Sequence, residues 1–372
     1  MYRVIKSQIE KHLKKPKARA VLILGLRQTG KTTLAKAVCE GKKHQIFNFD
    51  LISDRQEFSD ANRHSLADFS KRFKNQIIII DEVQKMPEAT EIIKHLYDQY
   101  KMKFILTGSS EIKIRKNFGD SLAGRVKTWR LYPLSFREIL VQGKKIGEKE
   151  KLDYELSQIE LQKYLIYGSL PAVENLPGEE HPIFLKDFTE ALLSKDILEV
   201  AEIKKSTKIY SLAKFLAMQV GQLVNVNELA MLTEISRPSI YNYLDILEQM
   251  NIIIRAYPVS TNERQAISEK FKVYFSDLGL RNFLVGNFES LPNRIDAGAL
   301  LENAAYVGIK RGLDYSGKMY KLGFFRSKTG SEIDIVVKTD KEYLYEVKAA
   351  KKYALKKGKV KYITKENIWE YL

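Results

Sequence analysis

The segment GLRQTGKT at residues 25–32 constrains the fold more than any other part of this 372-residue chain. It satisfies the pattern G-x-x-x-x-G-K-[S/T], follows the apolar run AVLIL at residues 20–24, and precedes TLAKAVCE, whose spacing is helical. A strand, a glycine-rich loop and a helix in this order are the context in which the pattern forms a phosphate-binding loop. The sequence therefore predicts an α/β domain that begins with a nucleotide site.

Each residue type in this loop has a chemical reason. Gly25 and Gly30 let backbone N–H groups curl around the β-phosphate, at a helix N-terminus with positive potential. Lys31 is expected to reach the β- and γ-phosphates, and Thr32 to give its hydroxyl to a magnesium ion. We expect ATP with Mg²⁺ to contact the whole segment Gly25, Leu26, Arg27, Gln28, Thr29, Gly30, Lys31, Thr32 and Thr33.

Four consecutive isoleucines, residues 77–80, predict a strand that is buried on both faces of a parallel sheet. Asp81 follows at its carboxyl end, where α/β sheets place ligand chemistry, and is expected to hold the magnesium ion through a water molecule. Glu82 is the natural base to polarise an attacking water. A simple turn is the alternative for this Asp-Glu pair, but the upstream phosphate loop favours the catalytic interpretation.

Two later polar positions are candidates for the same site. KFILTGSS predicts a third strand that ends in Ser109 and Ser110, either of which could hydrogen-bond the γ-phosphate or the water, although a plain turn fits equally well. SLAGRV offers Arg125, whose fixed charge could stabilise the transition state in cis or from a neighbouring subunit. A surface ion pair is an equal alternative for this arginine.

The order of these motifs carries a family resemblance. GLRQTGKTTL, IIIIDEVQK, ILTGSS, SLAGR and LYPLSFREI, followed by YGSLPAV at 167–173 and KVYFSDLGL at 272–280, resemble the archaeal and bacterial AAA-type ATPases that carry a carboxy-terminal domain of unknown function. The resemblance covers nearly the whole chain. It implies an AAA-like parallel-sheet ATPase domain over residues 1–142, makes a ring or dimer plausible, and identifies no substrate.

Composition bounds the partners. The formal net charge of +16, with a pI near 9.4, attracts polyanions, of which nucleic acid is the commonest in the cytosol. A lysine-rich solvated surface explains the charge equally well. No stretch approaches the roughly 20 apolar residues of a membrane span, and the first residues have no signal-peptide core. With a single Cys39, which excludes a disulfide framework, a cytoplasmic location without membrane association is expected.

The middle of the chain predicts two smaller parts. Residues 143–203 open with a lysine- and glutamate-rich stretch and continue with helical patterns, which predict a helical lid. Residues 204–260 predict three helices and a short strand, the order of a winged helix-turn-helix, with Ser236 as N-cap of the third helix. We expect four side chains of that helix to meet DNA: Arg237, Ser239, Tyr241 and Asn242. Docking to a protein is the alternative.

Residues 261–372 contain an acidic and basic set. GALLENAAYVGIKR predicts a helix with Glu302, FFRSKTGSEIDIVVK a strand pair with Asp334, and YLYEVKAA a strand on which Glu346 and Lys348 share one face. This set resembles the PD-(D/E)XK nuclease signature, and so implies a restriction-endonuclease-like α/β domain. The segment AAKKYALKKG that follows is shorter than the helix such folds normally have.

Charge predicts the roles in such a site. Asp334 and Glu346 would bind one or two magnesium ions, Lys348 would orient the water or stabilise the transition state, and Glu302 would complete the metal shell or align Lys348. Nuclease folds also persist as inert binding modules. The sequence thus favours an ATPase coupled to a DNA-binding, DNA-cleaving module. A nucleotide-gated DNA-binding or scaffolding protein is the alternative, and a chaperone-like ATPase is a third.

Overall fold

The computed structural model describes residues 2–109, 111, 114, 122–147, 150, 154–197, 206–259, 270–327, 331–349 and 360–372. The chain divides into two compact units, Met1–Tyr132 and Pro133–Leu372. Within the described residues, no helix is both long enough and apolar enough to cross a membrane.

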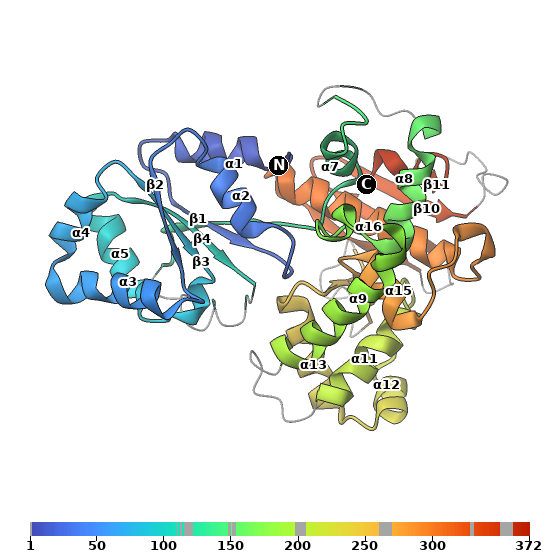
Figure 1. Ribbon diagram of the computed structural model, residues 1–372. Coiled ribbons are helices and arrows are strands. Elements are labelled where there is room, and N and C mark those ends of the chain that lie inside the picture. The colour runs from blue at the N-terminus through green and yellow to red at the C-terminus, as the bar shows by residue number, and fades with distance from the viewer. Residues whose placement is uncertain are drawn as a thin grey trace. The chain divides into compact units, whose positions relative to one another are not determined.

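The first unit is built on a five-stranded parallel sheet (Figure 1). In spatial order its strands are β2 (His44–Asn48), β3 (Ile77–Asp81), β4 (Lys103–Gly108), β1 (Ala20–Leu24) and β5 (Val126–Arg130). Every residue of β3 is buried, which confirms the prediction of a strand covered on both faces. Because β1 lies between β4 and β5, the phosphate loop follows an inner strand of the sheet.

Helices cover both faces of this sheet. They are α1 (Lys6–Leu13), α2 (Lys31–Val38), α3 (Ile52–His64), α4 (Leu66–Arg72), the 3₁₀ turn η1 (Val83–Lys85) and α5 (Ala89–Tyr100). Alternate strand residues, such as Leu22 and Phe104, share one core with α3, α4 and α5. In that core the ring centroids of Phe47 and Phe58 lie 5.3 Å apart. Figure 1 shows α1 and α2 on the other side of the sheet.

The second unit begins with helices. These are α7 (Phe136–Gln142), α8 (Tyr154–Tyr167), η2 (Val173–Asn175), η3 (Gly178–Glu180), α9 (His181–Glu190) and the π-helical η4 (Ala191–Asp196). The helices α8 and α9, expected to form a lid, pack against α15 (Leu278–Val285), where buried Asn282 donates to the backbone oxygens of Leu165 and Ile166 at 3.0 and 2.8 Å.

The next part of this unit is three helices followed by a two-stranded sheet. The helices are α11 (Ser206–Met218), α12 (Val226–Thr233) and α13 (Arg237–Gln249), and β6 (Ile253–Ala256) pairs antiparallel with β7 (Lys272–Phe275). Ser236 caps α13 by accepting from the Ser239 amide, which confirms the predicted cap, and Ile240, Leu244 and Leu247 are buried.

The unit ends in α16 (Ala297–Ser316), which follows η5 (Leu291–Asn293), and a second sheet. That sheet has the order β11-β10-β9-β8, formed by β8 (Lys321–Arg326), β9 (Glu332–Lys338), β10 (Glu342–Lys348) and β11 (Val360–Thr364), before η7 (Ile368–Glu370). The expected strand pair over residues 324–338 is confirmed, because β8 and β9 are antiparallel neighbours. The segment AAKKYALKKG lies, after Ala349, outside the described residues.

The helix α7 and the strand β7 each associate with residues across one of the expected domain boundaries. Residues 133–142 belong to the second unit, because the Leu134 amide donates to the Ser169 oxygen at 2.9 Å and α7 packs on α8. β7 lies beyond residue 260, yet its partner is β6 of the preceding segment. The division into residues 1–142, 143–203, 204–260 and 261–372 stays a prediction.

Candidate functional site

The phosphate loop joins β1 to α2. Gly30 adopts a left-handed conformation with φ 87°, and a Cβ on Gly25 would collide with the backbone oxygen of Leu131, so both positions require glycine. The ammonium of buried Lys31 donates to the backbone oxygens of Gly25 and Leu26 at 3.1 Å each. Lys31 therefore lies over its own loop, at the place where phosphate oxygens would approach.

The loop contacts the end of β3 directly. The Thr32 hydroxyl donates to both carboxylate oxygens of Asp81 at 2.8 Å, and the buried Thr107 hydroxyl of β4 donates to the same carboxylate. Parallel strands end at one edge of the sheet, which is why these three residues converge. Thr32 and Asp81, the two predicted magnesium ligands of this site, are thus in contact.

Glu82 lies at the same edge, in a left-handed conformation with φ 52°. Its carboxylate accepts from the Ser109 hydroxyl at 3.0 Å and from the Gln84 amide, while its own amide donates to Thr107 at 3.3 Å. The structure thus brings the predicted base and Ser109 together. Gln84 was missed in the sequence, although its place two residues after Glu82, in the turn after the strand, could have indicated it. Ser110 lies outside the described residues.

Arg3 is a second residue that sequence reasoning missed. Its guanidinium, 2% exposed, donates to the backbone oxygen of Thr29 in the loop and to that of Tyr132 at 3.1 Å. The guanidinium carries several N–H donors, so it can join two carbonyl groups at once. Arg3 therefore ties the phosphate loop to the chain after β5, and no local motif marks it.

Arg125 lies at the amino-terminal end of the strands, opposite the end that carries the phosphate loop. It precedes β5, whose first residue, Val126, pairs with Ala20 at the start of β1, whereas the phosphate loop follows the end of β1. Its guanidinium forms an ion pair with Asp98 of α5 at 2.8 Å. The expectation of a role in cis is therefore corrected, because the length of a strand separates this arginine from the loop of its own chain. A contribution from a neighbouring subunit stays a prediction.

The donor set of this site fits a magnesium-bound triphosphate. Mg²⁺ prefers hard oxygen ligands, and Thr32 and Asp81 supply a hydroxyl and a carboxylate side by side. The loop Gly25–Thr33 would hold the phosphates with its backbone amides and Lys31. Buried Leu26 and Thr29 anchor the loop, while Arg27, Gln28 and Thr33 are exposed.

The second unit holds the other predicted set. Glu302 of α16 is largely buried and accepts from the Lys272 ammonium at 3.0 Å and from the Tyr274 hydroxyl at 2.6 Å. Burial raises the pKa of Glu302, and the positive charge of Lys272 opposes that shift. Lys272, 2% exposed, also pairs with Glu332 at 2.6 Å. This lysine was missed, although a charged residue at the start of the apolar run KVYF could have indicated it.

Asp334 of β9 accepts from the Val347 amide of β10 at 2.8 Å. Burial raises the pKa of Asp334, and the positive charges of Lys272 and Lys348 oppose that shift. Glu346 and Lys348 lie 3.3 Å apart, while Val347 is buried on the other face of β10, as strand alternation predicts. The predicted set is therefore adjacent, although within the described residues no three His, Cys, Asp or Glu side chains converge to hold a metal ion.

The predicted DNA-contacting residues lie at the start of α13. Arg237, Tyr241 and Asn242 are exposed, and Ser239 is half-buried, with its hydroxyl 2.9 Å from that of Ser236. The Arg237 guanidinium donates to Asn227 of α12. The buried and exposed faces of α13 thus separate as expected, and the contact with DNA stays a prediction.

Comparison with known proteins bears on both units. Residues 17–140 match the family described as AAA domain, and residues 158–291 and 297–368 match two domains of unknown function (DUF8612 and DUF4143). An uncharacterized protein of Methanocaldococcus jannaschii is 25% identical over 384 residues, covering 94% of this chain and 80% of that relative. One of Haemophilus influenzae is 25% identical, covering 87% and 80%.

Among solved structures, a Walker-type ATPase of Pyrococcus abyssi has a TM-score of 0.48 and 16% identity, covering 75% of this chain and 94% of its own. The AAA match spans the sheet, the phosphate loop and the Asp81–Glu82 strand end described above. Residues 17–140 thus belong to a P-loop ATPase domain of the AAA type, and two domains of unknown function follow it in the chain.

Proposed function

We propose that the first unit binds and hydrolyses ATP with Mg²⁺, and that this cycle is coupled to DNA binding by the second unit. The contact of Thr32 with Asp81, beside Lys31 and Glu82, is the observation that carries the proposal. Lys31 would offset phosphate charge, Thr32 and Asp81 would hold the ion, and Glu82, oriented by Ser109 and Gln84, would take the proton of the attacking water.

Two variants test the hydrolytic half. Lys31→Ala is expected to abolish nucleotide binding or turnover, and Glu82→Gln to bind ATP and release no phosphate, because an amide cannot accept the proton. Lys36→Ala, an exposed lysine of the same helix, is the matched control. Binding is measured with a fluorescent ATP analogue and turnover as phosphate release. Wild-type turnover in both Lys31→Ala and Glu82→Gln would show that the chemistry lies elsewhere.

The second half of the proposal rests on α11–α13 and the β6–β7 pair. Three helices followed by an antiparallel pair support a winged helix-turn-helix, and α13 presents Arg237, Tyr241 and Asn242 to solvent. Arginine and asparagine can read base edges, and hydroxyls can bind phosphates. DNA as partner, and relatives that are archaeal and bacterial, support the proposal of a cytoplasmic location. An AAA-type core also supports a homo-oligomer, in which Arg125 could act on a neighbour.

The double variant Arg237→Ala/Asn242→Ala tests the DNA contact. It is expected to weaken duplex binding about 10-fold or more, since good base contacts contribute about 1–3 kcal/mol each. Lys186→Ala, exposed on α9, removes the same charge and serves as control. Binding is titrated at several salt concentrations with and without ATP. Duplex affinity that is weak and insensitive to salt would instead favour a chaperone-like ATPase acting on protein.

A second candidate function is metal-dependent DNA cleavage, favoured by the adjacency of Asp334, Glu346 and Lys348. Glu346→Ala is the test, with Glu342→Ala of the same strand as control, on supercoiled and linear DNA with Mg²⁺ or Mn²⁺ and with or without ATP. Cutting that vanishes only in Glu346→Ala would support cleavage. Absence of cutting with intact DNA binding would favour a nucleotide-gated DNA-binding or scaffolding protein.

A further inference from the structure

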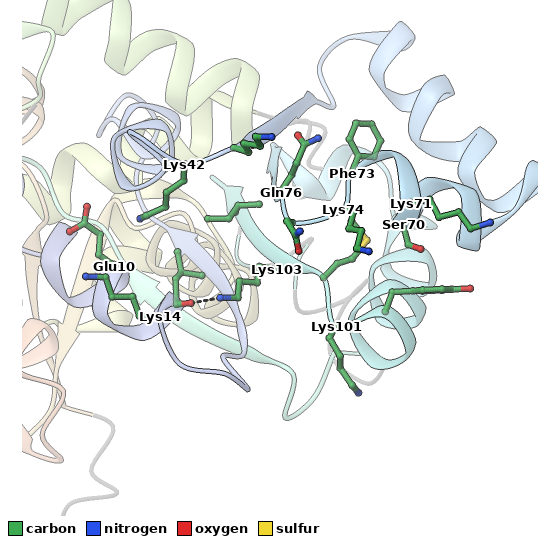
Figure 2. A pocket seen from close by; sticks show the side chains of 16 residues that line it. Glu10, Lys14, Lys42, Ser70, Lys71, Phe73, Lys74, Gln76, Lys101 and Lys103 are labelled. Atoms are coloured by element: carbon green, nitrogen blue, oxygen red, sulfur yellow. Dashed lines mark hydrogen bonds between the residues drawn. The ribbon is translucent and has the colours of Figure 1, made fainter.

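A hollow of about 700 Å³ lies in the first unit, at the amino-terminal ends of the sheet strands, whereas the phosphate loop lies at their carboxyl ends (Figure 2). Its walls include Lys43 just before β2, Ile77 at the start of β3 and Lys103 at the start of β4. The phosphate loop follows the far end of β1, and a strand of five residues spans about 16 Å. The hollow is therefore separate from the ATP site.

The charge of this hollow is one-sided. Seven lysines line it, against a single acidic residue, Glu10, which lies 3.9 Å from Lys6. Figure 2 shows Lys14 and Lys42 at one end of the hollow and Lys71 and Lys74 at the other. These lysines come from four segments that are far apart in the sequence, so the fold itself gathers them.

Part of this charge is used within the protein, and part is not. The Lys103 ammonium donates to the backbone oxygen of Leu13 at 2.8 Å, which anchors it in the wall. Lys14, Lys43 and Lys74 are exposed, and no carboxylate in the described part of the chain pairs with them. Gathered like charges repel one another and attract anions, so this edge favours a ligand with several negative charges.

The remaining lining indicates the class of ligand. Phe73 and Met102 add apolar side chains to the lining, Tyr100 is exposed to 38% of its surface, and Gln76 offers an amide. Lysine is a point charge that accepts phosphates in many registers, and none of the lining residues, all of which the structure describes, is an arginine. An aromatic ring among lysines is the arrangement on which bases stack while the backbone follows the charge.

We propose that this hollow binds single-stranded nucleic acid through its phosphates, with Lys14, Lys43 and Lys74 as the principal contacts and Tyr100 as a stacking surface. A single strand is favoured over a duplex, because only unpaired bases can stack on an aromatic side chain. The site goes beyond the proposed function: it lies in the other unit and shares no residue with α13.

The triple variant Lys14→Gln/Lys43→Gln/Lys74→Gln tests the site in the full chain. The control is Lys186→Gln/Lys318→Gln/Lys341→Gln, three exposed lysines of the second unit, which lowers the net charge equally. The probes are fluorescein-labelled oligothymidylate and oligouridylate, whose anisotropy is titrated between roughly 50 and 200 mM salt. The two probes distinguish DNA from RNA.

The variant Lys14→Gln/Lys43→Gln/Lys74→Gln, here the pocket variant, is expected to bind the oligonucleotides at least about 10-fold more weakly. The slope of log affinity against log salt concentration should be lower by about 2, because each lost phosphate contact in a single strand accounts for about 0.7. The control is expected to change affinity less than about 2-fold. Equal behaviour of the two triple variants would overturn the proposal. So would displacement of oligothymidylate by polyglutamate at an equal concentration of charges, since any polyanion would then suffice.

The Arg237→Ala/Asn242→Ala variant distinguishes this site from the proposed DNA contact of α13. If it loses duplex binding while keeping the single strand, and the pocket variant does the reverse, both sites stand. If only the α13 variant loses binding, for both kinds of probe, the pocket proposal fails and the proposed function holds. As an independent readout, oligothymidylate is expected to protect Lys14, Lys43 and Lys74 from acetylation, but not Lys186.

Discussion

The Thr32 hydroxyl donates to both carboxylate oxygens of Asp81 at 2.8 Å, which joins the phosphate loop to the end of β3. The two residues are 49 positions apart in the sequence. Their contact places a hydroxyl and a carboxylate, both suited to Mg²⁺, at the mouth of the loop that would hold the phosphates. It also predicts that the hydroxyl, and not merely the size of the side chain, is required at position 32.

Thr32→Val keeps the shape of the side chain and removes the hydroxyl. We expect magnesium-dependent ATP affinity to fall about 10- to 100-fold, because a hydrogen bond or ligand contact to a charged group contributes about 1.5–3 kcal/mol. Thr32→Ser retains the hydroxyl and is expected to bind within a few-fold of wild type. Titration with a fluorescent ATP analogue, with and without Mg²⁺, measures both. Unchanged magnesium dependence in Thr32→Val would contradict the assignment.

Arg3→Met is expected to destabilise the first unit by about 2–5 kcal/mol. The variant leaves the buried oxygens of Thr29 and Tyr132 without this donor, and each such loss costs about 1–3 kcal/mol. ATP affinity should fall as well, since the loop loses its anchor. Arg19→Met, at an exposed arginine, is the control. Urea unfolding followed by Trp129 fluorescence in a Trp369→Phe background measures the change, and equal midpoints for the two variants would refute it.

Lys272→Met is expected to destabilise the second unit by about 3–5 kcal/mol, because it leaves the largely buried carboxylate of Glu302 without its cation and removes one partner of the half-buried Glu332. Adding Glu302→Gln should recover part of the loss, since one buried charge is then removed. Unfolding of the single and double variants, followed by Trp369 fluorescence in a Trp129→Phe background, gives the coupling. A double variant as unstable as the sum of the two single variants would show that the pair is not coupled.

Asp277 predicts a pH dependence of stability. Burial raises the pKa of this carboxyl to about 6, although the amides of Ser169 and Leu280 donate to it. A carboxyl with a higher pKa in the folded chain binds its proton more tightly there. The contribution of Asp277 to stability is therefore greatest below the ordinary pKa near 4 and falls as the pH rises to about 6, by roughly 3 kcal/mol.

Asp277→Asn removes this titration, so the difference in unfolding free energy between wild type and variant should change between about pH 4 and pH 6 and stay constant above. Asp187→Asn, at an exposed aspartate of α9, is the control. Urea unfolding at several pH values, with Trp369 as the only tryptophan, follows the second unit. A difference that is independent of pH across this range would exclude Asp277 as the titrating group.

Local patterns in the sequence determined the parts of the site that depend on neighbouring residues. The glycine and lysine spacing of residues 25–33 predicts the phosphate loop, because that geometry is closed within one turn of backbone. The isoleucine run predicts β3, and Asp81 and Glu82 follow from their place at its end. The two-residue period of a strand likewise predicts that Glu346 and Lys348 share a face.

Tertiary structure alone decided which distant residues meet. Arg3 contacts the oxygen of Tyr132, 129 positions away, and Lys272 pairs with Glu332 of another strand. Arg125 is part of the motif SLAGR, from which a role at the nucleotide site was expected, yet strand pairing places it at the amino-terminal end of the strands, beside Asp98. The basic hollow likewise gathers lysines from separate segments. The physical reason is that a motif encodes local conformation through sterics and periodicity, whereas strand order and register, set by the packing of the whole core, determine long-range contacts.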